Sequence, residues 1–269
     1  MSFPLPSPQA TAVITGASSG IGAALARTLA SRGYGTTLVA RDGARLRHVA
    51  AVLQRNGARV DTIEADLTSR ADRRNVEAQI RQTGLAVDIL INGAGAATRT
   101  SIPECDLGTE LAHMELNVVS VVDLCRTFVG DMLARRSGAI LNVASTAAFK
   151  PLHGQGTYAA SKAFVLSFTR TLRAELQDSP VTVTALCPGP VPTEFARRAG
   201  FSDEEIATIP SIMWHSADDV AAMAVDAMER GAELCIPGRA NVVDATMALL
   251  KAKQQAAQAV SRKTAARRD

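Results

Sequence analysis

The chain has 269 residues, of which 47% are hydrophobic, enough to bury the core of one ordinary α/β domain. Its net charge of +3 is too small to indicate a nucleic-acid partner or an anionic membrane, and no apolar run approaches the roughly 20 residues that span a bilayer. The four cysteines are widely spaced, without histidines at ligand spacing, which predicts reduced thiols, no metal and a cytoplasmic location.

Short apolar runs alternate with helical stretches along the chain, as is typical of βαβ units around a parallel sheet. The expected strands cover residues 11–15, 36–40, 59–63, 87–92, 139–144, 181–187 and 233–236. The expected helices cover residues 20–32, 43–56, 70–83, 105–134, 157–177 and 217–230. Capping boxes mark helix starts at Ser69, Ser202 and Ser216. The sequence predicts a single doubly wound α/β domain over residues 11–250, with a parallel sheet of about seven strands, after an N-terminal tail of residues 1–10.

Two segments depart from this rhythm. Residues 188–215 form an unusually long connection after a strand, rich in apolar residues such as Phe195, Phe201 and Trp214, which predicts a lid over a site at the carboxyl edge of the sheet. A plain surface excursion is the alternative. Residues 251–269 are basic and hold almost no bulky apolar residue, so we expect a solvated, frayed tail there, with contact to an acidic partner as the alternative.

A glycine-rich turn connects the first strand to the first helix. Glycines at this place let the backbone approach a pyrophosphate, and the free amides of the helix start attract its charge. The expected contacts are Gly16, Ser18, Ser19, Gly20, Ile21 and Gly22. A structural turn without a ligand is the alternative.

Tyr158 and Lys162 are four residues apart, so they share one face of the predicted helix over 157–177. A free tyrosine has a pKa near ~10, and a neighbouring cation favours the phenolate and lowers that pKa. The pair therefore predicts a proton-transferring tyrosine. On its own, such a pair also occurs on solvated helices.

Several further motifs stand in a fixed order around this pair: Asp66-Leu67, Asn92-Gly93-Ala94-Gly95, Asn117, Ser145 and the segment 188–193, Pro-Gly-Pro-Val-Pro-Thr. With the glycine turn and Tyr158-x-x-x-Lys162, they resemble the single-domain branch of the short-chain dehydrogenase/reductase family over about residues 10–237. The family has a Rossmann-type fold. This chain departs from its pattern at Gly93, where asparagine is usual, and at Ala144, where many relatives have serine; we expect changed hydrogen bonding at Gly93 without loss of the cofactor.

The resemblance implies a catalytic tetrad of Asn117, Ser145, Tyr158 and Lys162. Ser145 and Tyr158 would bind the substrate oxygen, and Tyr158 would exchange a proton with it. Lys162 would lower the phenol pKa and hold the nicotinamide ribose, while Asn117 would support a water relay to Lys162. Taken singly, each residue also has a structural explanation, such as a strand-end cap for Ser145.

The resemblance also implies the cofactor. Relatives specific for NAD usually have an aspartate after the second strand; this chain has Ala40 followed by Arg41, which favours the 2′-phosphate of NADP(H). Asp42 is a possible competitor for Arg41. The other implied cofactor contacts are Asp66, Leu67, Asn92, Gly95, Pro188, Gly189, Val191 and Thr193, together with Tyr158 and Lys162.

The resulting expectation is an NADP(H)-dependent oxidoreductase that interconverts a ketone or aldehyde and an alcohol, on an apolar or acyl-type substrate. A non-catalytic NADP(H)-binding sensor or scaffold is the alternative. His153 either borders the substrate pocket or lies in a solvated loop. Family members associate through two long helices, so we expect a homodimer or homotetramer.

Overall fold

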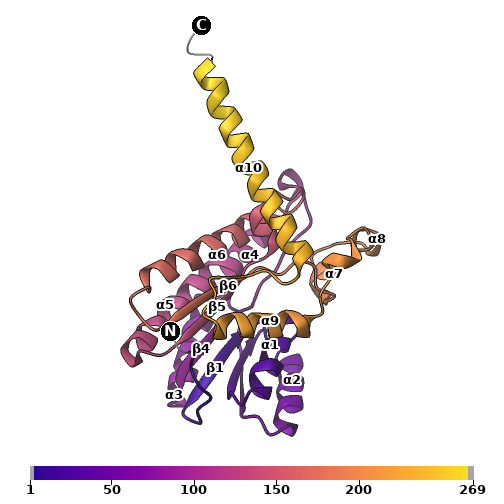
Figure 1. Ribbon diagram of the computed structural model, residues 1–269. Coiled ribbons are helices and arrows are strands. Elements are labelled where there is room, and N and C mark those ends of the chain that lie inside the picture. The colour runs from indigo at the N-terminus through magenta and orange to yellow at the C-terminus, as the bar shows by residue number, and fades with distance from the viewer. Residues whose placement is uncertain (1–2, 266–269) are drawn as a thin grey trace.

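Seven parallel strands form one sheet in the computed structural model, which describes residues 3–265 (Figure 1). The strands are β1 (Ala10–Thr15), β2 (Thr36–Ala40), β3 (Val60–Glu64), β4 (Ala86–Asn92), β5 (Ala139–Val143), β6 (Thr182–Leu186) and β7 (Leu234–Cys235). Their order is β3-β2-β1-β4-β5-β6-β7, so the direction of winding reverses between β1 and β4. The predicted doubly wound, Rossmann-type sheet is confirmed, and each expected strand overlaps an observed one.

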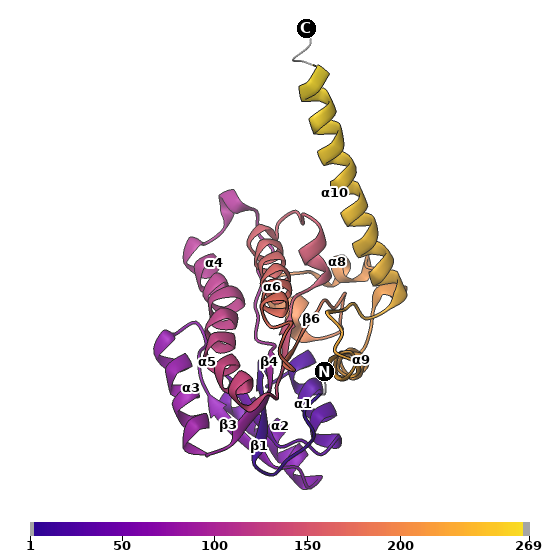
Figure 2. The same cartoon turned by 60° about the vertical axis from the view of Figure 1, so that its left-hand side comes forward.

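Helices cover both faces of the sheet (Figure 2). One face carries α1 (Gly20–Ser31), α2 (Gly43–Arg55) and α9 (Ala217–Glu229), and the other carries α3 (Arg70–Gln82), α5 (Ser120–Arg135) and α6 (Gly156–Glu175). Each layer buries a continuous apolar cluster against the strands, which explains why the strands read as unbroken apolar runs. With both faces closed, the carboxyl ends of the strands and their loops are left to form a site.

The helix expected over 105–134 is divided in the structure. It consists of a 3₁₀ turn η1 (Ile102–Glu104), α4 (Leu107–Met114), a π-helical turn η2 (Glu115–Val119) and then α5. The Ser120 amide donates to the carbonyl of Glu115, five residues back, which gives the helix one extra residue in this turn. Hydrophobic periodicity alone does not reveal such a local rewinding.

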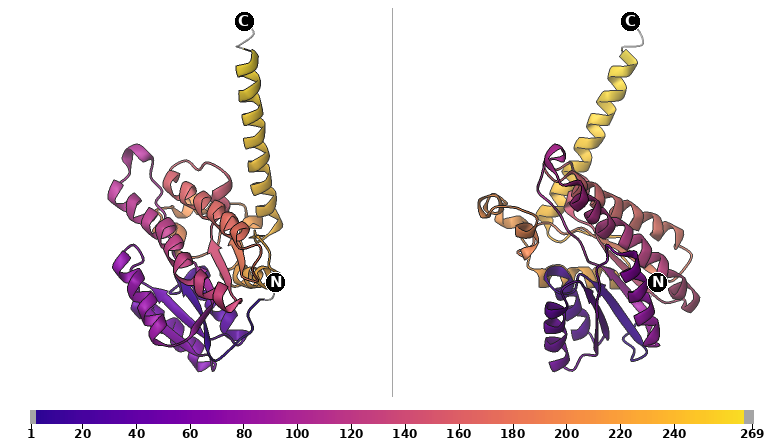
Figure 3. Two further views of the ribbon diagram at one scale, coloured as in Figure 1. Left: turned by 90° about the vertical axis from the view of Figure 1, so that its left-hand side faces the viewer. Right: turned by 180° about the vertical axis from the view of Figure 1, so that it is seen from behind.

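The carboxyl end also differs from the expectation. After β7, residues Arg239–Ala265 form one long helix, α10, that stands out from the body (Figures 1 and 3). The frayed tail predicted from residue 251 is therefore wrong as far as Ala265, and residues 266–269 lie outside the described part of the chain. Residues 251–265 are poor in bulky apolar residues but rich in alanine, lysine and glutamine, all strong helix formers.

The loops at the carboxyl edge contain four short elements: η3 (Thr146–Phe149), α7 (Glu194–Arg198), α8 (Asp203–Ala207) and η4 (Ser211–Met213). Ser69, Ser202 and Ser216 each accept a hydrogen bond from the amide three residues later, so the three helix starts are confirmed. The full capping box, with the reciprocal contact from Glu205, forms at Ser202, whereas Ser69 and Ser216 act as simple caps. Across residues 3–265, none of the helices is both long and apolar enough to cross a membrane.

A buried amide network joins two central strands beneath the site, and we predict that Asn142→Leu will destabilise the fold. Asn142 is fully buried; its Oδ1 accepts from Asn92 Nδ2 (2.8 Å) and its Nδ2 donates to Thr169 Oγ1 (3.0 Å). Leucine makes neither hydrogen bond, so Asn92 Nδ2 and Thr169 Oγ1 each lose a buried partner. We therefore expect the free energy of unfolding to fall by about 2 kcal/mol. Urea unfolding measures this loss, with exposed Asn56→Leu as the control; equal stability of the two variants contradicts the prediction.

Candidate active site

The β1–α1 turn is shaped by glycines at close backbone contacts. Gly16 has φ +70, a left-handed conformation that side-chain-bearing residues rarely adopt, and a Cβ on Gly22 would overlap the Gly16 carbonyl. Ser18 and Ser19 are partly exposed, and the Ser19 side chain, at the N-cap of α1, makes no cap hydrogen bond within the described chain. The first amides of α1 and two hydroxyls are thus available to an anion such as a pyrophosphate.

Gly93, the departure from the family motif, lies against this turn. The amides of Gly93 and Ala94 donate to Thr15 Oγ1 at 3.0 and 3.1 Å. A Cβ at position 93 would lie 2.8 Å from the Thr15 carbonyl oxygen. In this structure, glycine at position 93 thus lets the chain lie close against the end of β1.

Asn117 lies in the π-helical turn and is 1% exposed. Its Oδ1 accepts from the Ala96 amide (2.9 Å), and its Nδ2 donates to the Ala96 carbonyl (2.8 Å) and to Ser161 Oγ (3.2 Å). These contacts tie the loop after β4 to helix α6. In this structure the Asn117 side chain is a clamp between two elements, and its expected support of a water relay remains a prediction.

Ser145 follows β5 in an extended conformation, and its Oγ accepts from the Ala147 amide (3.1 Å) at the start of η3. The hydroxyl proton is left to donate elsewhere. Ser145 faces Tyr158 and lowers the pKa of that phenol. The structure thus brings together two hydroxyl groups thirteen positions apart in the sequence, one from a strand end and one from the first turn of α6.

Lys162 is buried to 5% exposure, and its Nζ donates to the Val143 carbonyl (2.8 Å). The same nitrogen lies 5.8 Å from the centre of the Tyr158 ring. Burial lowers the pKa of Lys162 to about 8, which leaves the amine close to titration at neutral pH.

The expected effect of this amine on Tyr158 is not what the structure shows. Burial raises the pKa of the phenol, against the lowering by Ser145, so the protonated form is favoured. The ammonium is directed to the Val143 carbonyl, and the groups that shift the phenol pKa are its own burial, Ser145 and Cys187. The prediction of a phenol pKa lowered by Lys162 is therefore wrong for the chain without ligands.

Arg41 leaves the end of β2 with a side chain that is 81% exposed, and its guanidinium lies 3.9 Å from Asp66. Asp42, the alternative partner of Arg41, instead caps α2 by accepting from the Arg45 amide (3.0 Å). Asp66 Oδ1 accepts from the amide and hydroxyl of Thr68 (3.0 and 2.8 Å). An exposed arginine here is suited to a phosphate.

The remaining predicted contacts divide into two groups. Asn92 and Leu67 are buried in the interior, so their side chains are not open to a ligand. Pro188, Gly189, Val191 and Thr193 form the loop after β6, where the Thr146 amide donates to the Pro188 carbonyl (3.0 Å). Thr193 caps α7 and packs on Gly20, where a Cβ would lie 3.3 Å from its methyl group. This contact joins the two loops that the sequence assigns to the cofactor.

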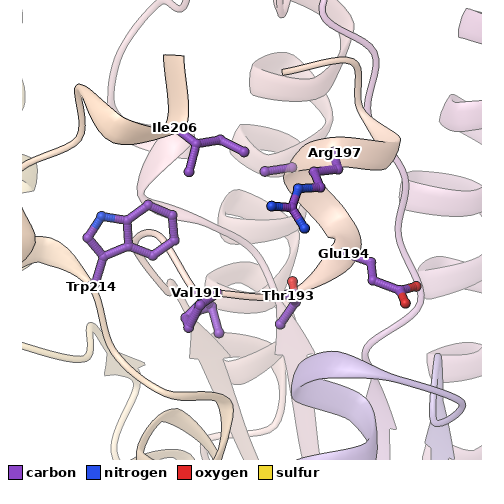
Figure 4. Close-up of a pocket in the computed structure, with 8 residues that line it drawn as sticks. Val191, Thr193, Glu194, Arg197, Ile206 and Trp214 are labelled. Atoms are coloured by element: carbon purple, nitrogen blue, oxygen red, sulfur yellow. The ribbon is translucent and has the colours of Figure 1, made fainter. Parts of the chain in front are cut away.

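The segment 188–215 lines an open cavity of about 380 Å³, of which neither Ser145 nor Tyr158 forms a wall (Figure 4). Its walls are mostly apolar or aromatic, with Arg197 and Glu194 at one side: Val191, Pro192, Thr193, Glu194, Ala196, Arg197, Ile206 and Trp214. The Phe195 ring, from the same segment, lies 5.7 Å from the Tyr158 ring, centre to centre. A lid over the phenol thus remains the interpretation that these contacts favour.

Sequence reasoning missed the groups that hold this segment in place. Arg99 binds Glu205 through Nη2 (2.5 Å) and stacks over Phe201 at 5.0 Å. Asn241, fully buried at the start of α10, donates to the Met213 carbonyl (3.1 Å) and packs against Gly189. These partners are distant in sequence and carry no local motif, so no pattern in the chain signals them.

Residues 10–203 match the profile described as short chain dehydrogenase, most of the chain, and this protein belongs to that family of oxidoreductases. It is similar to a short-chain dehydrogenase from Sphingobium yanoikuyae solved with NADPH: 34% identity, TM-score 0.81, covering 93% of this chain and 95% of that one. It is also similar to the bulky-bulky ketone specific alcohol dehydrogenase of Comamonas testosteroni (29%, TM-score 0.77, 94% and 95%). A third similar structure, from Burkholderia phymatum, was solved with NAD (25%, TM-score 0.83, 95% and 96%).

The buried amine generates a stability prediction: Lys162→Met will stabilise the ligand-free protein at pH 7. A lysine whose pKa falls from 10.5 to about 8 on folding destabilises the native state below pH 8, and this penalty fades as pH rises toward 10.5. Methionine removes the penalty but leaves the Val143 carbonyl without its donor, so we expect a net gain of about 1 kcal/mol. Denaturant unfolding at several pH values measures the gain, which should shrink above pH 8; a variant less stable at pH 7 overturns it.

Proposed function

We propose that this protein interconverts a ketone or aldehyde and an alcohol by hydride transfer with NADP(H). The observation that carries the proposal is the meeting of Ser145, Tyr158 and Lys162 at the carboxyl edge of the sheet, beside an open helix start. The residues of the β1–α1 turn fit a dinucleotide, since close glycines and free amides leave room and charge for a pyrophosphate. When bound, the nicotinamide supplies or accepts the hydride.

The side chains provide the proton chemistry. The hydroxyls of Ser145 and Tyr158 would hold the carbonyl oxygen, and the phenol would donate its proton as the alcohol forms. A phenol with a raised pKa is protonated at neutral pH, which is the form required for reduction. Lys162, with a pKa of about 8, would return a proton to the phenolate, and its place beside Asn117 and Gly95 supports a relay to solvent.

The walls of the cavity support an apolar substrate. Val191, Ile206 and Trp214 give it apolar surface, and Phe195 stands against the phenol. The similarity to an enzyme named for bulky ketones points in the same direction. An apolar or acyl-type ketone is therefore the proposed substrate class.

Arg41 supports the choice of NADP(H), because it is exposed at the end of β2 and the residue before it is Ala40, where NAD-specific relatives usually have an aspartate. The NADPH complex of a similar enzyme agrees with this choice, whereas another similar protein was solved with NAD. Exposed apolar residues on α4 and α6, among them Leu111 and Phe164, support self-association into a homodimer or homotetramer.

Replacing the phenol separates catalysis from binding. Tyr158→Phe keeps the ring but removes the proton donor, so we expect ketone reduction to fall at least ~100-fold while NADPH binding changes little. The reaction is followed by loss of reduced-nicotinamide absorbance over a panel of apolar ketones, and binding by nicotinamide fluorescence. If the unaltered protein binds NADPH tightly and reduces none of the ketones, the non-catalytic sensor is the better account.

Removing the arginine tests the cofactor assignment. Arg41→Ala should weaken NADPH binding about tenfold, because a charge-assisted bond to the 2′-phosphate is lost, and leave NADH binding nearly unchanged. Dissociation constants for both cofactors at one fixed ionic strength decide the matter. A wild-type protein that prefers NADH contradicts the assignment.

A further inference from the structure

A bidentate ion pair joins two elements on opposite sides of the proposed cofactor site. Arg45, in the first turn of α2, binds Glu194, the first residue of α7, with Nη1–Oε2 2.5 Å and Nη2–Oε1 3.2 Å. The two residues are 149 positions apart. The pair therefore closes a large loop of the chain with one surface contact.

The position of each partner places the pair beside the expected path of the cofactor. Arg45 Nε lies 3.4 Å from Asp42, the residue that directly follows Arg41. Glu194 directly follows Thr193, whose methyl group packs on Gly20 at the start of α1. Arg45 is thus four residues after Arg41, the proposed 2′-phosphate contact, and Glu194 is next in sequence to a residue that packs on the proposed pyrophosphate turn.

The Arg45–Glu194 ion pair is weak enough for another anion to replace the Glu194 carboxylate. Both side chains are about half exposed, 44% for Arg45 and 54% for Glu194, and ion pairs at such exposure are weak. Glu194 also contacts Arg198, one turn later on α7, so it keeps a cation when Arg45 leaves. Arg45 has a second anion in Asp42, whose Oδ2 lies 3.4 Å from Nε while Oδ1 caps α2, but this contact is longer and involves a single nitrogen of the guanidinium.

We propose that Arg45 is a specificity-determining residue for the cofactor, which exchanges the Glu194 carboxylate for the 2′-phosphate of NADP(H). The inference rests on the proposed function. A phosphate monoester carries more negative charge than a carboxylate and accepts the same bidentate guanidinium, so it displaces Glu194, whereas the 2′-hydroxyl of NAD(H) does not. The contact between α2 and α7 then opens only for the phosphorylated cofactor.

This exchange would link the cofactor to the lid. Phe195, which packs on Tyr158, directly follows Glu194 in α7. Release of Glu194 frees the start of α7 from α2, so the 2′-phosphate would alter the segment that covers the phenol. The position of Phe195 against Tyr158 would then depend, through α7, on whether the bound cofactor carries the 2′-phosphate.

Two variants with opposite expected effects test the proposal. Arg45→Gln should weaken NADPH binding about tenfold, and Glu194→Gln, which removes the competing carboxylate, should tighten it about threefold. NADH binding should change less than about twofold in both. The control is Arg47→Gln, on the same helix, whose guanidinium faces Glu64 at 3.6 Å and should leave both cofactors unaffected. Dissociation constants are measured by nicotinamide fluorescence on the full chain.

The outcomes distinguish this inference from the proposed function. If the wild-type protein prefers NADH, the NADP(H) assignment itself fails. If it prefers NADPH but Arg45→Gln leaves the ratio of the two constants unchanged, only the role of Arg45 is overturned. Equal tightening of NADPH and NADH in Glu194→Gln would show a plain tether of the lid, with no exchange for phosphate, and would also overturn the inference.

Discussion

The burial of one amine is the constraint on which the proposed chemistry depends. Lys162 stands in the interior, held by the Val143 carbonyl at the end of β5, and its pKa falls to about 8 because charge is poorly solvated there. An exposed lysine, with a pKa near 10.5, would be a weaker acid and therefore a poorer proton donor to the phenolate. The burial of Tyr158 raises the pKa of its phenol, so the phenol is protonated in the absence of ligand and has a proton to donate.

The parallel sheet explains why these groups meet at all. Every strand points its carboxyl end to the same edge, so Ser145 after β5 and the Pro188–Val191 loop after β6 are neighbours although far apart in sequence. The reversal of winding between β1 and β4 opens the crevice beside the glycine turn. The fold thereby brings together the residues of the proposed anion site and of the proposed proton donor, which are far apart in the sequence.

What the sequence predicts and what it misses follow from the range of the interactions. The strands, the caps at Ser69 and Ser216, and the gathering of Ser145 with Tyr158 depend on local patterns or on the sheet topology, and they were predicted. The π-helical turn at Asn117 depends on tertiary packing against Ala96 and Ser161. The part of α10 after residue 250 depends on helix propensity, whereas its first turns face the core through Asn241 and Ala245. The sign of the Tyr158 pKa shift depends on burial, which spacing in a chain does not report.

Helix α10 lies after residues 10–203, which match the family profile, and it contacts the loops around the candidate site. Asn241 fastens the Met213 carbonyl and packs on Gly189, and Asp244 binds Lys150 at 2.5 Å, just after η3. The first turns of α10 are thus fixed to the loop after β6, to the end of the lid and to the segment that follows Ser145. The segment 188–215 is thus held by Glu194 to α2, by Glu205 to Arg99 and by the Met213 carbonyl to the fully buried Asn241 of α10, and the exposed Arg45–Glu194 pair is the contact that we propose a ligand displaces.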